Sequence, residues 1–268
     1  MSAVAVRAAA NDPPRRIVSM NLCADQYVLL LAPREHIRSI SFLAADPNES
    51  PLAHLARGLK LNYGNAEEVI AENPDLILTG EFTTGFAKAL LRKLGYRVVE
   101  IESVRNLEGT RRVLTDMGRL LGAEGAAAAL ITDMDRRLDA VRAAAKPRAV
   151  ASAIVYDANG FTVGKPSLAD EALSAAGLEN LAPSLGIVDF GQLALEDLLM
   201  ARPQVIVRLD YRPGAASLAA QAIAHPAVKA MMDGRAPLHI SGRLLTCAIP
   251  TIADAAEALN SQLVAGGS

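Results

Sequence analysis

The chain has 268 residues, of which 51% are apolar, and its 27 basic and 29 acidic side chains leave a net charge of -2. This composition supports a full hydrophobic core in one large domain or two modest ones, and the near balance of charge provides no general attraction to nucleic acid or to an anionic membrane. No apolar run reaches the length of about eighteen residues that a transmembrane helix requires. The opening MSAVAVRAAANDPP is too short and too polar for a secretory signal, so we expect residues 1–15 to be a tether, either native or left after removal of an export signal.

Short β-branched runs alternate with segments of helical length along most of the chain. The expected strands are 16–20, 37–41, 75–79 and 97–101 in the first half, and 149–156, 204–209 and 237–241 in the second. Such alternation predicts parallel sheets with helices on both faces, which is the α/β class.

The alternation stops between Thr110 and Lys146, where proline is absent and apolar residues recur at helical spacing. One long helix or a helix pair fits this segment, and the 23 residues from Ala123 to Ala145 would span roughly 35 Å as a helix. A crossover helix within one large sheet is the alternative, but the strand groups on either side favour two lobes. The expected boundaries are an N-terminal lobe at 16–121, a connecting helix at 122–146 and a C-terminal lobe at 147–268.

Two segments 129 residues apart are written almost alike: EEVIAENPDLILTG begins at Glu67, and EDLLMARPQVIVRL begins at Glu196. In both, acidic residues start a short amphipathic helix, a proline ends it seven residues after the first glutamate, and an apolar strand follows. We therefore predict one helix-turn-strand unit in each lobe, with the lobes related by pseudo-symmetry. A chance match between two generic units is the alternative.

Motifs for catalysis and for metal binding are absent or defective. In NGFTVGKPS the two glycines are one residue too close for a phosphate-binding loop, and Pro166 stands where a serine or threonine would hold magnesium. No G-x-G-x-x-G follows the first expected strand. The four histidines lack metal-ligand spacing. We therefore predict no catalytic residue, no metal site and no cofactor.

The two cysteines, Cys23 and Cys247, lie near opposite ends of the chain. A count of two is compatible with either a reducing or an oxidising compartment. We expect both to be small, buried and unpaired, because pairing cannot be inferred from a count alone.

Aromatic and arginine side chains gather after the expected strands. Ligands of open α/β sheets bind beyond the carboxyl ends of the strands, so Phe42, Phe82 and Phe190 are expected to face a ligand, whereas Phe86, on a helix, is expected in the core. The arginines at these ends are Arg105, Arg208, Arg212 and Arg243, with Tyr211 beside them. Guanidinium groups suit an anionic ligand.

The order of several stretches carries a resemblance to a known family. RIVSMNLCADQYVLLLA, SFLAADP, GNAEEVIAENPDLILTG, the long helical segment, FTVGKPSLADEALSAAGLENL and LEDLLMARPQVIVR resemble the periplasmic substrate-binding proteins of ABC importers. More narrowly, they resemble the helical-backbone class that binds ferric siderophores, cobalamin and haem. The resemblance covers roughly residues 15–262. It implies two Rossmann-like α/β lobes joined by a long rigid helix, with the ligand cleft between them.

The resemblance also implies site residues. The positions that match the ligand cleft are Asn21, Cys23, Phe42, Glu81, Phe82, Phe190, Tyr211, Arg212 and Arg243, to which Arg105 and Arg208 are added by their places after strands. In that family one glutamate near the top of each lobe docks onto arginines of the permease, and the matching positions are Glu67 and Glu196. The opposing interpretation is that both merely complement a helix dipole, which contributes about 0.3 to 1 kcal/mol.

The resulting hypothesis is a non-enzymatic, monomeric periplasmic receptor without its signal peptide. It would capture a metal chelate, a ferric siderophore in the first place, for a dimeric ABC permease in the inner membrane, with no nucleic-acid partner. Cobalamin-binding members have a tryptophan-rich cleft, whereas this chain has no tryptophan and places Phe190 at the matching position, so a corrinoid fits less well; haem is the other alternative. Alternatives from other classes are an enzyme, metal-chelatase-like or nucleotide-dependent, and an interaction module whose aromatic residues meet protein.

Overall fold

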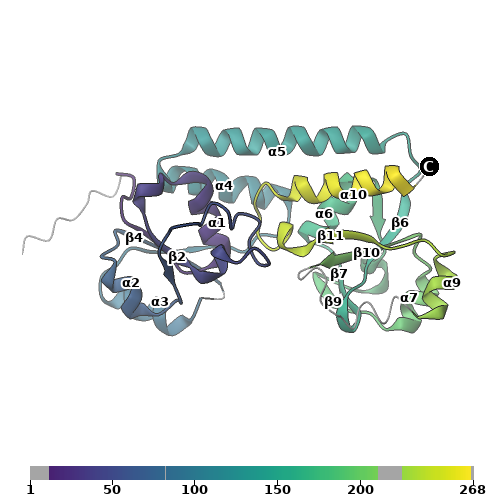
Figure 1. Cartoon of the computed structure of the whole chain (residues 1–268), viewed down its shortest axis with the longest axis horizontal. Coiled ribbons are helices and arrows are strands. Elements are labelled where there is room, and N and C mark those ends of the chain that lie inside the picture. Colours follow the sequence, from purple (N-terminus) through teal and green to yellow (C-terminus); the bar gives the residue numbers. More distant parts are fainter. Residues whose placement is uncertain (1–11, 82, 211–224, 267–268) are drawn as a thin grey trace, which may run out of the picture. The chain divides into compact units, whose positions relative to one another are not determined.

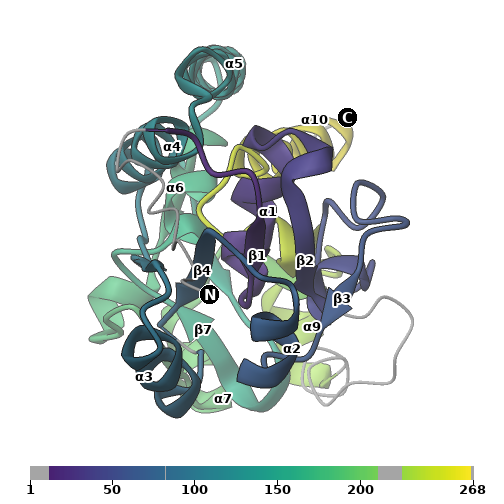
Figure 2. The same cartoon turned by 90° about the vertical axis from the view of Figure 1, so that its left-hand side faces the viewer.

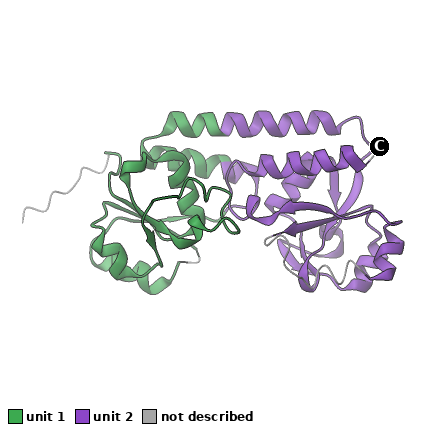
Figure 3. Ribbon diagram, viewed as in Figure 1, with its two compact units in different colours: residues 1–103, 111–130 green, residues 104–110, 131–268 purple. Residues whose placement is uncertain are grey.

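The protein is described here by a computed structural model, which covers residues 12–81, 83–210 and 225–266 (Figure 1). The chain divides into two compact units (Figure 3). Unit 1 comprises residues 1–103 and 111–130, and unit 2 comprises residues 104–110 and 131–268. Each unit contains its own parallel sheet, so the predicted two-lobed α/β class is confirmed. The lobe boundaries drawn from the sequence stay a prediction.

Unit 1 is built on a five-stranded parallel sheet in the order β3-β2-β1-β4-β5. The strands are β1 (Ile17–Ser19), β2 (Ile37–Ser41), β3 (Leu61–Asn62), β4 (Leu76–Gly80) and β5 (Val98–Ile101). The helices are α1 (Leu22–Leu31), α2 (Ala66–Ala71) and α3 (Gly85–Lys93), with 3-10 turns η1 (Arg34–His36) and η2 (Phe42–Ala45). Buried side chains of α2 and α3 pack against β1 and β4 on one face, and these two helices lie side by side (Figure 2).

Unit 2 is built on a four-stranded parallel sheet in the order β11-β10-β6-β8, with a separate antiparallel pair β7-β9. The strands are β6 (Ala151–Val155), β7 (Phe161–Val163), β8 (Leu178–Asn180), β9 (Phe190–Gln192), β10 (Val205–Asp210) and β11 (Leu238–Ser241). The helices are α6 (Leu168–Ala175), α7 (Leu195–Ala201), α9 (Pro226–Met231) and α10 (Ile252–Gly266), with turns η3 (Ala158–Gly160), η4 (Ala182–Leu185) and η5 (Gly242–Leu244). One core joins α6 and α10 to the sheet, and a second joins α7 and α9 to its opposite face.

The proline-free segment forms two helices, α4 (Leu107–Leu121) and α5 (Glu124–Ala145), separated by a turn in which Gly122 has a φ of 67°. Positive φ costs glycine little, so this residue ends α4 without strain. The helix pair was one of the two predicted forms. The division between the units falls inside both helices.

The two sheets repeat one topology. The order β2-β1-β4-β5 of unit 1 corresponds to β8-β6-β10-β11 of unit 2, and all neighbours within both sets are parallel. The two similar sequence segments form corresponding pieces, α2 followed by β4 and α7 followed by β10. The predicted helix-turn-strand units are therefore confirmed, and a chance match does not account for the shared strand order.

The turns of the two repeated segments agree in detail. Asn73 and Arg202, 129 positions apart, have φ values of 47° and 46°, and each precedes a buried proline. Beyond that proline, Asp75 Oδ1 accepts a hydrogen bond from Arg16 N at 2.9 Å, and Gln204 Oε1 accepts one from Ser152 N at 2.9 Å. In both units the residue after the proline therefore fixes the start of the neighbouring strand.

Three sequence-based expectations need correction or addition. Phe86 lies on α3 as expected but is 82% exposed, so its assignment to the core is wrong. Neither cysteine is a free thiol, so the expectation of unpaired cysteines is wrong as well. The short strands β3, β7, β8 and β9 were not predicted, because two or three residues are too few to show a period. Over the described ranges, no helix is long and apolar enough to cross a membrane.

Candidate functional site

In unit 1, the connection after β1 is held by Asn21, which is the N-cap of α1. Its Oδ1 accepts hydrogen bonds from Cys23 N at 3.0 Å and Ala24 N at 3.4 Å. Gly80 ends β4 so close to this side chain that a Cβ there would lie 2.6 Å from Asn21 Cγ. The cap therefore commits the side-chain oxygen of Asn21 to the start of α1. Glu81 follows Gly80 and is exposed.

Two aromatic rings stack at neighbouring strand ends of unit 1. Phe42 follows β2 and Tyr63 follows β3, and these strands are paired in parallel. The ring centroids lie 5.2 Å apart with an interplanar angle of 24°, while Phe42 is 44% and Tyr63 67% exposed. The pair therefore presents an open aromatic surface at the carboxyl edge of the sheet. Tyr63 was not predicted as a site residue because the strand before it has only two residues. Its position shortly before the repeated helix is the sequence signal that could have indicated it.

A buried carboxyl group supports this aromatic surface. Asp25 on α1 is fully buried, and its carboxylate accepts hydrogen bonds from Ser41 N at 3.1 Å and from Ser41 Oγ at 2.5 Å. Burial raises the pKa of Asp25 to about 7, although the hydrogen bonds from Ser19 and Ser41 oppose that shift. Ser41 directly precedes Phe42, so the hydrogen bonds between Asp25 and Ser41 hold α1 beside the start of the segment that carries Phe42.

Unit 2 also carries two neighbouring aromatic rings on its two-stranded sheet, of which Phe190 is exposed and Phe161 is half-buried against the core. Phe161 of β7 and Phe190 of β9 have centroids 6.5 Å apart at 30°, and Phe190 is 64% exposed. A Cβ at Gly164 would lie 2.0 Å from Ile187 O, and one at Gly160 would lie 2.3 Å from Leu193 O. Only glycine permits this close approach of the two chain segments.

The GKPS stretch is thus a structural element of unit 2. Gly164 allows the close packing against Ile187, and Ser167 is the N-cap of α6, with its Oγ accepting a hydrogen bond from Asp170 N at 3.1 Å. The residues that resemble a phosphate loop are therefore accounted for by backbone packing and helix capping.

Two of the expected arginines lie beside carboxylates. Arg105 forms an ion pair with Asp189 within unit 2. Arg208 lies 3.5 Å from a carboxylate oxygen of Asp157 and 3.7 Å from one of Asp210. A guanidinium group already beside a carboxylate attracts an anionic ligand less strongly, so Arg105 and Arg208 support an anionic ligand less than their charge alone suggested.

Of the remaining expected residues, two lie within the described ranges and three outside them. Arg243 is half-buried on η5, directly after β11. Cys23 lies in the first turn of α1, and its sulfur is not a free thiol. Phe82, Tyr211 and Arg212 lie outside the described residues.

Glu67 and Glu196 occupy equivalent positions, each the second residue of its helix, α2 or α7. Both are exposed, and within the described chain neither takes part in an ion pair. The neighbouring Glu68 differs, because its carboxylate accepts a hydrogen bond from Tyr63 N at 2.8 Å. Burial, together with the negative charge of Glu196, raises the pKa of Tyr156. Because Glu67 and Glu196 are exposed and form no ion pair within the described chain, each unit offers one such carboxylate at the same position of the repeat.

Among the residues that the structure describes, no group of three or more His, Cys, Asp or Glu side chains is arranged to hold a metal ion.

Comparisons with known proteins bear on this arrangement. A family model described as periplasmic binding protein matches residues 17–232. Two proteins described as cobalamin-binding, from two strains of Halobacterium salinarum, are each 26% identical over 200 residues, which is 74% of this chain and 54% of those proteins. The chain thus spans about half the length of the curated relatives it matches.

Solved structures share the fold. A possible iron-binding periplasmic solute-binding protein from Staphylococcus epidermidis has a TM-score of 0.78 at 18% identity, covering 94% of this chain and 99% of that one. A periplasmic haem-binding protein from Pseudomonas aeruginosa has a TM-score of 0.71 at 24% identity, with coverages of 93% and 92%. A protein of an Fe3+-hydroxamate transport system from Saccharomonospora viridis has a TM-score of 0.69 at 22% identity, with coverages of 94% and 93%. At these identities the likeness shows the fold alone.

Proposed function

The chain belongs to the periplasmic binding protein family, and on that premise we propose that it captures an iron chelate, a ferric siderophore, in the periplasm and delivers it to a dimeric ABC permease of the inner membrane. Membership makes the chain a binding protein rather than an enzyme, which sets the enzyme alternatives aside. The chelate, the permease and the compartment are parts of the proposal.

The observation that carries the proposal is that each unit has an aromatic pair with at least one exposed ring. Large aromatic side chains that are exposed beside another ring are more informative than single ones, and Phe42, Tyr63 and Phe190 are all at least 44% exposed. A ligand with rings or apolar arms can cover such surfaces, and a stacked aromatic pair contributes about 0.5 to 1.5 kcal/mol beyond the area it buries. Ferric chelates with catecholate or hydroxamate arms have this character.

The names of similar structures support iron as the cargo. One is described as possibly iron-binding and another as part of an Fe3+-hydroxamate transport system. The ion pairs of Arg105 and Arg208 favour a chelate of low net charge, because a highly charged anion would have to compete with Asp189, Asp157 and Asp210.

A tetrapyrrole is the second candidate. The curated relatives are described as cobalamin-binding and one similar structure as haem-binding. The exposed phenol of Tyr63 is of a type that ligates ferric haem iron, so it favours haem over cobalamin.

The test is a titration of the purified protein with a ferric hydroxamate, a ferric catecholate, haemin and cyanocobalamin, followed by tyrosine fluorescence and calorimetry. We expect saturable one-to-one binding of a ferric siderophore. Phe42→Ala and Phe190→Ala should each weaken it roughly tenfold, which corresponds to about 1.4 kcal/mol. Phe86→Ala, which removes a still more exposed phenylalanine ring on α3, is the matched control and should leave the affinity unchanged.

The outcomes separate the candidates. Binding of haemin with a spectrum that Tyr63→Phe alters would replace the siderophore by haem. Binding of cyanocobalamin alone would replace it by a corrinoid. Failure of all four compounds would overturn the assignment to metal chelates.

A further inference from the structure

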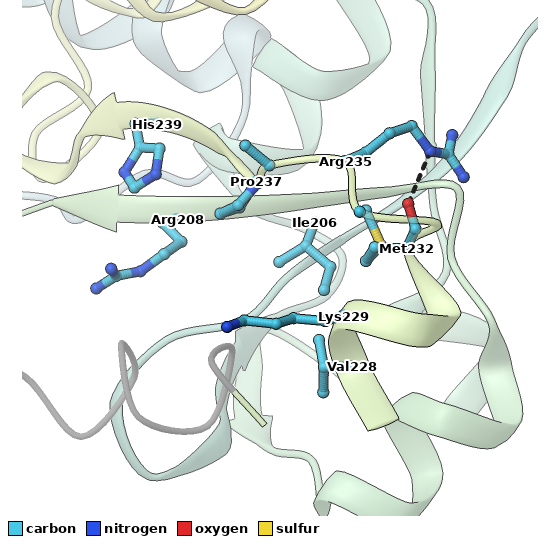
Figure 4. A pocket seen from close by; sticks show the side chains of 10 residues that line it. Ile206, Arg208, Val228, Lys229, Met232, Arg235, Pro237 and His239 are labelled. Atoms are coloured by element: carbon cyan, nitrogen blue, oxygen red, sulfur yellow. Dashed lines mark hydrogen bonds between the residues drawn. The ribbon is translucent and has the colours of Figure 1, made fainter. Parts of the chain in front are cut away.

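A cavity of about 380 Å³ lies within unit 2, between α9 and the strands β10 and β11 (Figure 4). Ligand pockets usually measure about 300 to 1,000 Å³, so this one suits a small molecule. Of the described residues that line this cavity, only Arg208 was also expected near the iron chelate.

The apolar wall of the cavity is part of a packed core. Ile206 of β10, Val228 of α9 and Met232, the residue after α9, line it, and each is at most 4% exposed. These side chains belong to the cluster that joins α7 and α9 to the sheet. The wall is therefore held in place by the fold, and a ligand would meet only the small part of these side chains that faces the cavity.

The polar lining is basic. Arg208, Lys229, Arg235 and His239 line the cavity, and no acidic side chain does so among the described residues. Figure 4 shows Lys229 extending from α9 toward the side of the cavity where Arg208 lies.

These basic groups differ in how far they are already neutralised. Asp210 lies 2.7 Å from His239 Nδ1 and 3.7 Å from Arg208, and Asp233 lies 3.8 Å from Arg235. Lys229 is exposed and, within the described ranges, forms no ion pair. Its amine is therefore the group with the least compensated charge at the cavity.

We propose that this cavity is a second binding site, for a small molecule that joins a compact apolar ring system to one carboxylate. The rings would lie against Ile206, Val228 and Met232, and the carboxylate would pair with Lys229. A charge-assisted contact of this kind is stronger than a neutral hydrogen bond. Because the hydrophobic effect is non-directional, this contact would also set the orientation of the ligand.

The probe for this site is 2-naphthoate, and the reporter is built into the wall. Protein labelled with 13C at its methionine methyl groups gives a signal for Met232 inside the cavity and one for Met200, which is 79% exposed on α7. Titration should shift the Met232 signal in a saturable manner and leave that of Met200 in place.

Three comparisons test the assignment. Lys229→Gln should weaken 2-naphthoate binding roughly tenfold, whereas Lys93→Gln, at an exposed lysine of α3 in unit 1, should not. The neutral 2-naphthamide should bind the unaltered protein roughly tenfold more weakly than 2-naphthoate. Phe42→Ala should leave the Met232 response unchanged, because this site does not depend on the proposed chelate site.

A Met232 signal that stays in place at millimolar 2-naphthoate would overturn the proposal. Equal shifts of Met232 and Met200, or equal affinities of the Lys229→Gln and Lys93→Gln variants, would do so as well, since they would indicate non-specific association.

Discussion

The two units share one sheet plan but differ in the connection after the first strand of each sheet. In unit 1, β1 leads directly into α1, and the exposed rings Phe42 and Tyr63 follow two adjacent parallel strands. In unit 2, β6 is followed by β7, which pairs with β9 and carries Phe161, the partner of Phe190. The sheet core is thus repeated while the connections at its carboxyl edge are not. This is expected when the core serves stability and the loops serve binding.

One feature that both units keep outside the sheet is the carboxylate at the second position of α2 and of α7. The helix dipole would be complemented by an acidic residue anywhere in the first turn, and Glu68 and Asp197 already lie in the first turns of α2 and α7. The dipole alone therefore does not explain why a carboxylate recurs at the second position. The equivalent exposure of Glu67 and Glu196 supports the proposed docking to the two halves of a permease.

The largest expected effect comes from reversing both carboxylates. The Glu67→Lys/Glu196→Lys double variant should lose uptake of the chelate almost completely in cells that carry the permease, because lysines would then repel the basic residues that the docking proposal expects on the permease. Its affinity for the chelate, measured by calorimetry, should stay unchanged.

The matched control is Glu35→Lys/Glu179→Lys, which makes the same change of net charge at exposed glutamates of the two units. Normal uptake by the Glu67/Glu196 double variant would contradict the docking proposal. Unequal losses in the two single variants would show that the units do not contribute alike.

A second effect concerns unit 1 alone. The pKa of Asp25 is raised to about 7 in the folded protein from an ordinary value of 3.8. Below about pH 3 the carboxyl is protonated in both states; between about pH 3 and 7 the unfolded chain loses this proton first, so the contribution to stability falls as pH rises. Asp25→Asn can keep both contacts to Ser41 and removes the titration. Relative to this variant, the wild type should lose about 3 kcal/mol of unfolding free energy between pH 4.5 and 7.5.

Chemical denaturation at a series of pH values checks this effect, with Asp233→Asn as the control at a side chain that is 84% exposed. An identical pH slope for the wild type and Asp25→Asn would refute the role of Asp25.

A third effect concerns the outer helices of unit 2. Arg137 on α5 donates from Nε to Glu257 Oε1 at 2.8 Å and from Nη2 to Asp254 Oδ1 at 2.5 Å, both on α10. These contacts raise the pKa of Arg137 and lower that of Glu257. Because the carboxylates are partly exposed and screened by solvent, Arg137→Met should lower the unfolding free energy by about 1 to 2 kcal/mol.

Arg136→Met is the matched control for this effect. Arg136 is exposed and pairs with Asp133 within the same helix, so its loss should cost at most about 0.5 kcal/mol. Equal losses for the two variants, measured by urea denaturation, would show that the contacts between α5 and α10 add nothing.

The smallest effect tests the repeated turn. Asn73 and Arg202 share a left-handed backbone, which asparagine adopts more readily than arginine. Arg202→Asn should therefore raise the melting temperature, by an amount corresponding to about 0.5 to 1 kcal/mol, and Asn73→Arg should lower it. A stabilising Asn73→Arg variant would show that the two turns are not equivalent.

Sequence reasoning succeeded where a signal was long or repeated. The strands 37–41, 75–79 and 204–209 were found to within one residue, and the 129-residue repeat correctly indicated two lobes. It failed where the signal was short or depended on distant residues. Tyr63 follows a two-residue strand, and the partner of Arg105 is Asp189, 84 positions away.

The sequence by itself determined the α/β class, the two copies of the sheet plan and the paired glutamates, because hydrophobic period, proline placement and repetition are local properties of a chain. Only the tertiary structure decided which rings stack, which arginines are neutralised and that a basic cavity lies beside α9. Those outcomes depend on contacts between residues far apart in the chain, since packing and electrostatics act through distance in space and not through position in the sequence.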